Sequence, residues 1–445
     1  MKSLHLLAFI FLMLLLCAVS CRKESVQQPP QPPVVPGCSS SISPESGSFV
    51  ISGATVTLSW TTVPNAISYD IYLSTEALPK TVVASNVTAT SVSYTVPAGA
   101  NTKYYWYAQP KNTNGPANGC TATVSHFTAI VINAPAAFGF YVVGYFPHYR
   151  NLSEVPDVKF RMCNVVNYAF FSVNAGGTLD VNNPALVPQV IAKAKTNRAK
   201  ILVSLNESAA GNFKNAAATA GTRNALIKDI MNKVRQYGFD GVDVDWEFPR
   251  TDDGTHITYA ALMKELSDSL HRDAKYYLSA AITAGKYSGV IRDAIQTEVF
   301  AYADWFNIMS YDDFDATVPF RHHSPYALSV TSLNYWLTTR GMPAAKCVLG
   351  FPAYGRASGI IQTGTTMSYR TILTQGGSSQ SDSALVSQGN FVNYKIYYNG
   401  QPTVKLKTML AKQRANGVMM WEMWHDAPDE NSLLKAACDT IGRVY

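Results

Sequence analysis

The chain has 445 residues, of which 47% are hydrophobic and 15% are charged. This composition excludes an intrinsically disordered protein and predicts a globular one, with a sizeable core and room for two domains. The formal net charge is only +6 and no run of basic residues stands out, so we expect no nucleic-acid partner.

Residues 1–20 have the pattern of an export signal. Lys2 supplies a positive charge, the short apolar run LLAFIFLMLLL follows, and small residues precede Cys21. The ending AVSC resembles the lipobox of bacterial lipoproteins, in which Cys21 would carry the lipid. An ordinary signal peptide cut nearby and an uncleaved anchor are the alternatives. We therefore expect an exported lipoprotein, anchored at the outer membrane or the cell surface.

Two segments follow the signal. Residues 21–37 are rich in Pro and Gln, a composition typical of an extended, solvated linker. Residues 38–130 predict a small antiparallel β-sandwich, because the short alternating segments ATVTLSW, SYDIYLS, SVSYTV and KYYWYAQPKN are separated by turn residues. The aromatic residues expected in its core are Trp60, Tyr69, Tyr105 and Tyr107. The segment resembles a fibronectin type III domain, which we expect to be a spacer, with polysaccharide binding as the alternative.

Of the seven cysteines, the five beyond Cys21 divide into two groups. Cys38 and Cys120 bracket the predicted sandwich and could form a disulfide in an oxidising compartment. Cys163, Cys347 and Cys438 lie in apolar contexts and are expected to be buried free thiols. The sequence has no CxxC motif or clustered His, so we expect no metal site.

Residues 138–445 alternate apolar segments typical of buried strands with amphipathic segments typical of helices. The eight strand candidates are GFYVVGYF, CNVVNYAFF, AKILVSL, FDGVDVDWEF, YYLSAAIT, WFNIMSY, KCVLGFPAYG and GVMMWEMW. Eight strands with helices between them predict an α/β fold of the (β/α)8 barrel type. A doubly wound open sheet is the alternative, but no glycine-rich phosphate turn follows the first strand.

The fourth strand candidate carries three acids. In a strand, Asp243, Asp245 and Glu247 would share one face and point into the mouth of the barrel, while Val244 and Trp246 would face the helices. Neighbouring carboxylates would lie about 6.6 Å apart. Two charges at that distance repel by about 2.5 kcal/mol at an effective dielectric constant of about 20. One of the three acids is therefore expected to hold a proton at neutral pH, as a general acid does.

Such an acid suits the cleavage of a glycosidic bond, which usually also requires a second carboxylate across the sugar. Acids on one strand line only one side of a site, so either another strand supplies a nucleophile or the substrate supplies its own. A calcium loop is the other interpretation of D-x-D-x-E. That loop needs polar turn residues, whereas Val244 and Trp246 stand here.

The segment DGVDVDWE carries the DxxDxDxE signature of glycoside hydrolase family 18, and the resemblance extends along the whole predicted barrel. GYFPHY resembles the first strand of the family, VNYAFF the second, NIMSYDDF the sixth with its MxYD motif, LGFPAYGR the seventh and GVMMWEMWHD the eighth. The resemblance implies a monomer that hydrolyses chitin or chito-oligosaccharides without metal or organic cofactor. An endo-β-N-acetylglucosaminidase acting on N-glycans is an alternative. A non-catalytic chitin-binding lectin is another, against which the presence of Glu247 argues.

The resemblance also implies a role for each motif residue. Glu247 would act as general acid and then as base, Asp245 would hold the N-acetyl group, and Asp243 would orient Asp245. Tyr311 would bind the acetamido oxygen, which in this family attacks the anomeric carbon to give an oxazolinium intermediate with retained configuration. The substrate-binding candidates are Asp312, Trp421, Tyr354, Arg356 and Tyr145, and the supporting candidates are Asp240 and Ser204. Tyr145 and Ser204 could be partners of Asp243, and Arg356 could instead close an ion pair.

Two features depart from the family pattern. The third strand ends in SLNE, with Asn206 and Glu207 in place of two glycines, so we expect an altered cleft floor. The segment between YGR and the eighth strand is short, so we expect no α+β insertion and a shallow groove suited to endo-action or to a soluble chain. His322 and His323 lie in a polar loop and are expected to be solvated.

Overall fold

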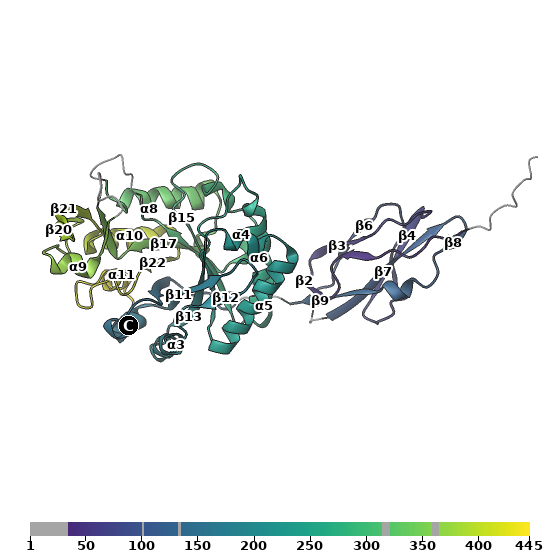
Figure 1. Ribbon diagram of the computed structural model, residues 1–445, viewed down its shortest axis with the longest axis horizontal. Helices are drawn as coiled ribbons and strands as arrows, with labels where there is room; N and C mark the ends of the chain where they lie inside the picture. Colours follow the sequence, from purple (N-terminus) through teal and green to yellow (C-terminus); the bar gives the residue numbers. More distant parts are fainter. Residues whose placement is uncertain (1–33, 100–101, 132–134, 314–320, 358–364) are drawn as a thin grey trace, which may run out of the picture. The chain divides into compact units, whose positions relative to one another are not determined.

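The computed structural model describes residues 34–99, 102–131, 135–313, 321–357 and 365–445. The expected signal segment, Cys21 and most of the linker lie outside the described residues. Contacts divide the chain into two compact units, the first ending at Ala129 and the second running from Ile130 to Tyr445 (Figure 1). Among the described helices, none has both the length and the apolar character needed to cross a membrane.

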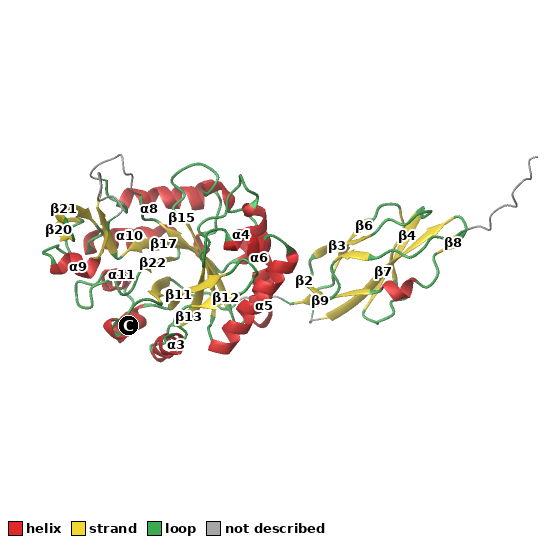
Figure 2. Ribbon diagram, viewed as in Figure 1, coloured by secondary structure: helices red, strands yellow, loops and turns green. Residues whose placement is uncertain are grey.

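The first unit is a sandwich of two mainly antiparallel sheets (Figure 2). One sheet has the strand order β1 (Ser41–Ser43), β3 (Thr55–Trp60), β6 (Ser91–Thr95). The other has the order β2 (Ser48–Ile51), β9 (Ser125–Ile130), β7 (Thr102–Asn112), β4 (Ser68–Ser74), β5 (Val82–Val87), with β8 (Gly115–Pro116) paired to β7. The four strands expected from the sequence are confirmed as β3, β4, β6 and β7.

The core of the sandwich corrects part of the aromatic prediction. Trp60 is buried in this core, as is Tyr69, in line with the expectation. In β7, however, Tyr104 and Trp106 face the core, whereas Tyr105 and Tyr107 lie on the opposite face. Alternation in the segment KYYWYA allows either pair to point inward, because both pairs are aromatic.

The predictions for the five cysteines beyond Cys21 are confirmed. Cys38 and Cys120 form a disulfide, which joins the start of the sandwich to the segment before β9. Cys163, Cys347 and Cys438 are free and buried.

The second unit contains a closed barrel of eight parallel strands, one at each predicted place. The strands are β10 (Tyr141–Pro147), β11 (Val165–Val173), β13 (Lys200–Glu207), β14 (Gly241–Val244), β15 (Tyr277–Thr283), β16 (Trp305–Met309), β17 (Cys347–Pro352) and β22 (Gly417–Trp421). Each strand pairs with its neighbours in the chain, and β10 closes the barrel by pairing with both β11 and β22. The short β12 (Leu179–Val181) adds an antiparallel pair to β11. The barrel prediction is confirmed, and the open sheet is excluded.

Helices cover the outside of the barrel (Figure 1). They are α2 (Asp157–Met162), α3 (Val187–Thr196), α4 (Asn212–Ala217), α5 (Ala220–Tyr237), α6 (Thr255–Leu270), α7 (Val299–Tyr302), α8 (Tyr326–Leu333), α10 (Gln401–Arg414) and α11 (Leu433–Ile441). In α5 the Thr219 side chain caps the first turn, and Gly238 ends the helix with a φ of 79°. Leu226, Ile230 and Val234 form its buried stripe at a spacing of four residues, which packs α5 onto the strands.

A small α+β unit lies between β17 and β22, so the prediction that this segment is too short was wrong. Its sheet has the order β19 (Thr366–Ser368), β18 (Tyr354–Ala357), β21 (Phe391–Tyr397), β20 (Ser383–Gln388), and α9 (Tyr369–Thr374) follows β19. The unit fits into this segment because its strands are short and because only two residues separate β20 from β21. Only Ala353 separates β17 from β18, so the unit begins at the rim of the barrel.

Candidate active site

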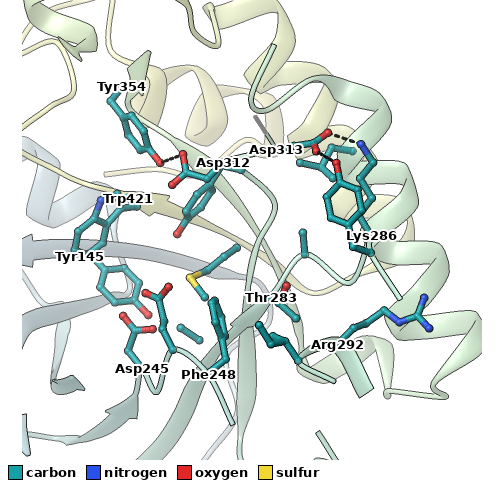
Figure 3. Close-up of a pocket in the computed structure, with 18 of the residues that line it drawn as sticks. Tyr145, Asp245, Phe248, Thr283, Lys286, Arg292, Asp312, Asp313, Tyr354 and Trp421 are labelled. Atoms are coloured by element: carbon teal, nitrogen blue, oxygen red, sulfur yellow. Dashed lines mark hydrogen bonds and ion pairs between the residues drawn. The ribbon is translucent and has the colours of Figure 1, made fainter. Parts of the chain in front are cut away.

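Asp245 and Glu247, which directly follow the fourth barrel strand, line a cavity at the carboxyl ends of the barrel strands. The cavity has a volume of about 510 Å³, within the range of small-molecule sites. Figure 3 shows Trp421, Tyr145 and Asp245 on one side of it and Lys286 and Arg292 on the other. The chain therefore places its candidate residues where barrels of this type keep their active sites.

Asp243 lies at the centre of the barrel and is fully buried. Its carboxylate accepts hydrogen bonds from four side chains, each on a different strand: Tyr145 at 2.7 Å, Ser204 at 2.7 Å, Ser279 at 2.5 Å and Asn307 at 3.2 Å. Burial raises the pKa of Asp243, although these four hydrogen bonds oppose the rise. The expected contacts of Tyr145 and Ser204 with Asp243 are present.

Asp245 is the next acid toward the rim. Its backbone N–H donates to the carbonyl of Leu205 at 2.9 Å, which fixes the residue just beyond the end of β14. Only 7% of Asp245 is exposed, and its Oδ1 atom has no hydrogen-bond partner among the described residues. Burial raises the pKa of Asp245 well above its usual range, and the charges of Glu247 and Asp243 raise it further. A buried, unpartnered carboxyl oxygen beside a cavity is suited to binding a donor group of a ligand.

Glu247 lines the cavity with an exposed side chain. Although the side chain is in contact with solvent, the surrounding cavity walls partly desolvate its carboxyl group. This desolvation and the nearby charge of Asp312 raise the pKa of Glu247, so it holds its proton at a higher pH than a free glutamate. The residue between the two acids, Trp246, points the other way and stacks on Phe213 of α4 with ring centroids 5.1 Å apart. The strand β14 ends at Val244, earlier than predicted, but the predicted alternation of side chains continues through Glu247.

Asp312 lies across the cavity at the end of β16 and is held by an ion-pair network. It accepts hydrogen bonds from Tyr354 at 2.7 Å and from Arg356 at 2.5 and 3.0 Å. Arg356 therefore forms the ion pair given as its alternative. Burial tends to raise the pKa of Asp312, but His323 and Arg356 outweigh it and lower the pKa below its usual range. Asp312 is thus fixed as a carboxylate.

His322 and His323 are both withdrawn from solvent, contrary to the expectation. His323 is fully buried, with Nδ1 3.3 Å from the Asp312 carboxylate and Nε2 3.2 Å from the carbonyl of Tyr354. His322 is half-buried, and its Nε2 lies 2.8 Å from the carbonyl of Tyr398. The prediction of solvated side chains was wrong because residues 321–324 pack against the segment that follows β16, where the Ser324 hydroxyl donates to the carbonyl of Ser310. Nothing in the local sequence indicates this contact.

Aromatic rings form the apolar side of the cavity. Trp421, at the end of β22, stacks on Phe170 with centroids 5.7 Å apart, and the Tyr145 ring lies 5.5 Å from it. Tyr311 lines the cavity, and its hydroxyl lies 4.0 Å from the sulfur of Met419. Phe170 was not singled out from the sequence, although it belongs to the second-strand segment VNYAFF.

The wall of the cavity opposite Asp245, called the far wall below, contains further residues that the sequence did not indicate. Asp313 is buried and binds the Lys286 ammonium at 2.6 Å and the Tyr287 hydroxyl at 2.5 Å, and it also pairs with Arg321. These contacts join the loop after β15 to the loop after β16 (Figure 3). Because Asp313 directly follows Asp312, the doubled acid in MSYDDF was the signal available for it.

The residues that replace the family glycines do not reach the cavity. Asn206 accepts a hydrogen bond from Ser172 at 2.8 Å, and Glu207 accepts from the backbone N–H groups of Gly211 and Phe213 near the start of α4. Neither residue is part of the cavity lining, and the expectation of an altered cleft floor stays a prediction. Asp240 has the expected structural position, where it accepts from the backbone N–H of Ile201.

The comparisons with known proteins all indicate the same family. The model of the family "Glycosyl hydrolases family 18" matches residues 141–426. Chitinase A1 of Niallia circulans is 28% identical over 334 residues, which cover 61% of this chain and 47% of that protein. For this protein and three further curated relatives, the match covers 36% to 58% of the relative's length.

Solved structures agree with this match. A chitinase from Bacteroides thetaiotaomicron has a TM-score of 0.59 and 26% identity, covering 69% of this chain and 98% of that one. The GH18 chitinase ChiB from the chitin utilization locus of Flavobacterium johnsoniae has a TM-score of 0.56 and 25% identity, covering 68% and 93%.

Proposed function

Because the chain belongs to glycosyl hydrolases family 18, we propose that it hydrolyses β-1,4 bonds in chitin or chito-oligosaccharides with retention of configuration. One observation carries the proposal. Within the described part of the chain, one buried oxygen of the Asp245 carboxyl group has no hydrogen-bond partner. It lies beside an exposed Glu247 of raised pKa, in a cavity walled by Trp421. This pairing supplies a binding group for an acetamide and a proton donor for a leaving oxygen.

The first step uses the substrate's own nucleophile. The sugar packs on Trp421, and its acetamide N–H donates to Asp245, which turns the acetamide oxygen toward the anomeric carbon. That oxygen forms a bond to the anomeric carbon as the glycosidic bond breaks, and Glu247 gives its proton to the departing oxygen. Asp245 stabilises the positive oxazolinium ring, and Asp243 holds Asp245 in place.

The second step returns the proton. Glu247, now a carboxylate, takes a proton from water while the water oxygen bonds to the anomeric carbon and the oxazolinium ring opens. The two displacements occur on opposite faces, so the β configuration is retained. The acids of the far wall support this assignment, because Asp312 and Asp313 are both occupied by ion pairs rather than available as nucleophiles.

The substrate class can be tested with three compounds. We expect the purified mature chain to cut N-acetylglucosamine hexamer into shorter β-anomers, detected by mass spectrometry and by NMR of fresh product. A glucosamine hexamer should remain intact, because it lacks the acetamide oxygen. Cleavage of a high-mannose glycopeptide, with one N-acetylglucosamine left on the peptide, would favour the N-glycan alternative instead. Binding of the hexamer without any product would contradict an enzymatic function.

We further propose that the chain is an exported lipoprotein, with Cys21 as the lipid-bearing residue and a fibronectin type III-like sandwich as a spacer. The motif AVSC and the disulfide between Cys38 and Cys120, a bond typical of proteins outside the cytoplasm, support this. In cells, Cys21→Ser should abolish incorporation of labelled palmitate and move the chain out of the membrane fraction. Unchanged labelling would contradict the lipid anchor.

A further inference from the structure

Helix α10 carries a lysine, Lys407, that is buried outside the cavity. Lys407 of α10 has no exposed surface, and its ammonium group donates to three oxygen atoms. These are the carbonyl and the hydroxyl of Ser324, both at 2.7 Å, and Oδ1 of Asn399 at 2.8 Å. An ammonium group has three N–H donors, so all of them are used. Burying such a charge costs free energy unless its hydrogen bonds are satisfied, and here Ser324 and Asn399 satisfy them.

The acceptors of Lys407 connect to the strand that carries the site. The Ser324 hydroxyl donates to the carbonyl of Ser310 at 2.7 Å, and Ser310 directly precedes Tyr311. The Asn399 side chain donates to the carbonyl of Ser324 at 2.8 Å. Ser324 is therefore bonded both to Lys407 of α10 and to the residue that directly follows β16.

The residue before Ser324, His323, lies against Asp312. The backbone nitrogen of Asp312 lies 3.4 Å from Nδ1 of His323, and the backbone N–H of Asp313 donates to the His323 carbonyl at 2.8 Å. Asp312 has a φ of 61°, in the left-handed region that residues other than glycine rarely adopt. The contacts from His323 thus help to keep Asp312 in an unfavourable backbone conformation that directs its carboxylate to Tyr354 and Arg356.

We propose that Lys407 is a positioning residue for the reaction. It fixes Ser324, and through the adjacent His323 it sets the conformation of Asp312 in the cavity. Lys407 is not part of the cavity lining, so its effect on the reaction passes through Asp312. The inference rests on the proposed function, because the position of Asp312 matters to a rate only if the cavity binds sugar.

A double-mutant cycle tests this coupling. We expect Lys407→Met to lower kcat/KM for N-acetylglucosamine hexamer by about tenfold, in the range expected for a small displacement of a positioned group. In the background of Asp312→Asn, the same substitution should lower kcat/KM by less than about twofold, since coupled residues are not additive. A further loss of about tenfold in that background would overturn the proposal, because a general effect on folding acts equally in both backgrounds.

Matched variants separate the remaining outcomes. Lys412→Met, at an exposed position of the same helix, should leave kcat/KM unchanged. If Lys407→Met does not fold, Ser324→Ala removes one acceptor and the bond to Ser310, and it should show a smaller loss with the same non-additivity. Full activity in Asp312→Asn would contradict the role of Asp312 in the proposed function. A loss in that variant together with additive effects of Lys407 would overturn only the inference.

Discussion

Replacing Glu247 with Gln should lower kcat for N-acetylglucosamine hexamer by about 10²- to 10⁴-fold, the contribution typical of a general acid. The amide has nearly the same shape as the acid but cannot give a proton to the leaving oxygen or take one from water. The Asp245 carboxyl and the Trp421 ring remain in place, so the dissociation constant of the hexamer should change by less than about threefold. Steady-state kinetics and calorimetric titration of the variant measure the two quantities.

The matched control is Glu430→Gln, which makes the same chemical change at an exposed position outside the cavity and should behave as the unmodified chain. Turnover by Glu247→Gln within a few-fold of normal would remove Glu247 from the mechanism. Loss of both turnover and binding would instead show that the cavity had changed its shape.

Replacing Asp245 with Asn should lower kcat by about 10²- to 10³-fold, the loss typical when a preorganised stabilising group is removed. The neutral side chain can still contact the acetamide, but it no longer supplies negative charge beside the oxazolinium ring. The effect therefore lies in kcat rather than in KM, because the charge develops after the substrate has bound. Kinetics with the hexamer over a range of concentrations separates the two parameters.

Asp180→Asn, in the exposed part of β12, is the control for this charge change and should leave the kinetics unchanged. A KM that rises while kcat stays normal would make Asp245 a simple binding residue. In that case the source of the nucleophile would have to be sought again among the cavity residues.

The barrel and much of the candidate site could be predicted from the sequence because both depend on local patterns. Each barrel strand is a short apolar run between turn residues, and the acids of DGVDVDWE sit at alternating positions of one such run. Alternation alone places Asp243 and Asp245 on the inner face and Trp246 on the outer one. Tyr311 and Trp421 were indicated by the resemblance to glycoside hydrolase family 18, whose MxYD motif and late Trp they match.

The residues that were missed depend on how distant segments meet. His323 acts on Asp312 only because residues 323 and 324 contact the segment that follows β16, and the composition around them is that of an ordinary polar loop. Tyr105 and Tyr107 were placed in the sandwich core because two alternating aromatic sets in one strand leave its orientation undetermined. The α+β unit was missed because its strands are short and one of them continues almost directly from β17.

The hydrogen bonds of Asp243 have a consequence for how this protein can change. Its four donors come from β10, β13, β15 and β16, so half of the barrel strands share a single polar centre. A substitution at any of these positions leaves a buried carboxyl oxygen short of a donor, whichever sugar is bound. New substrate preferences are therefore open to variation in the loops beyond the strands, whereas the interior residues around Asp243 can change only together.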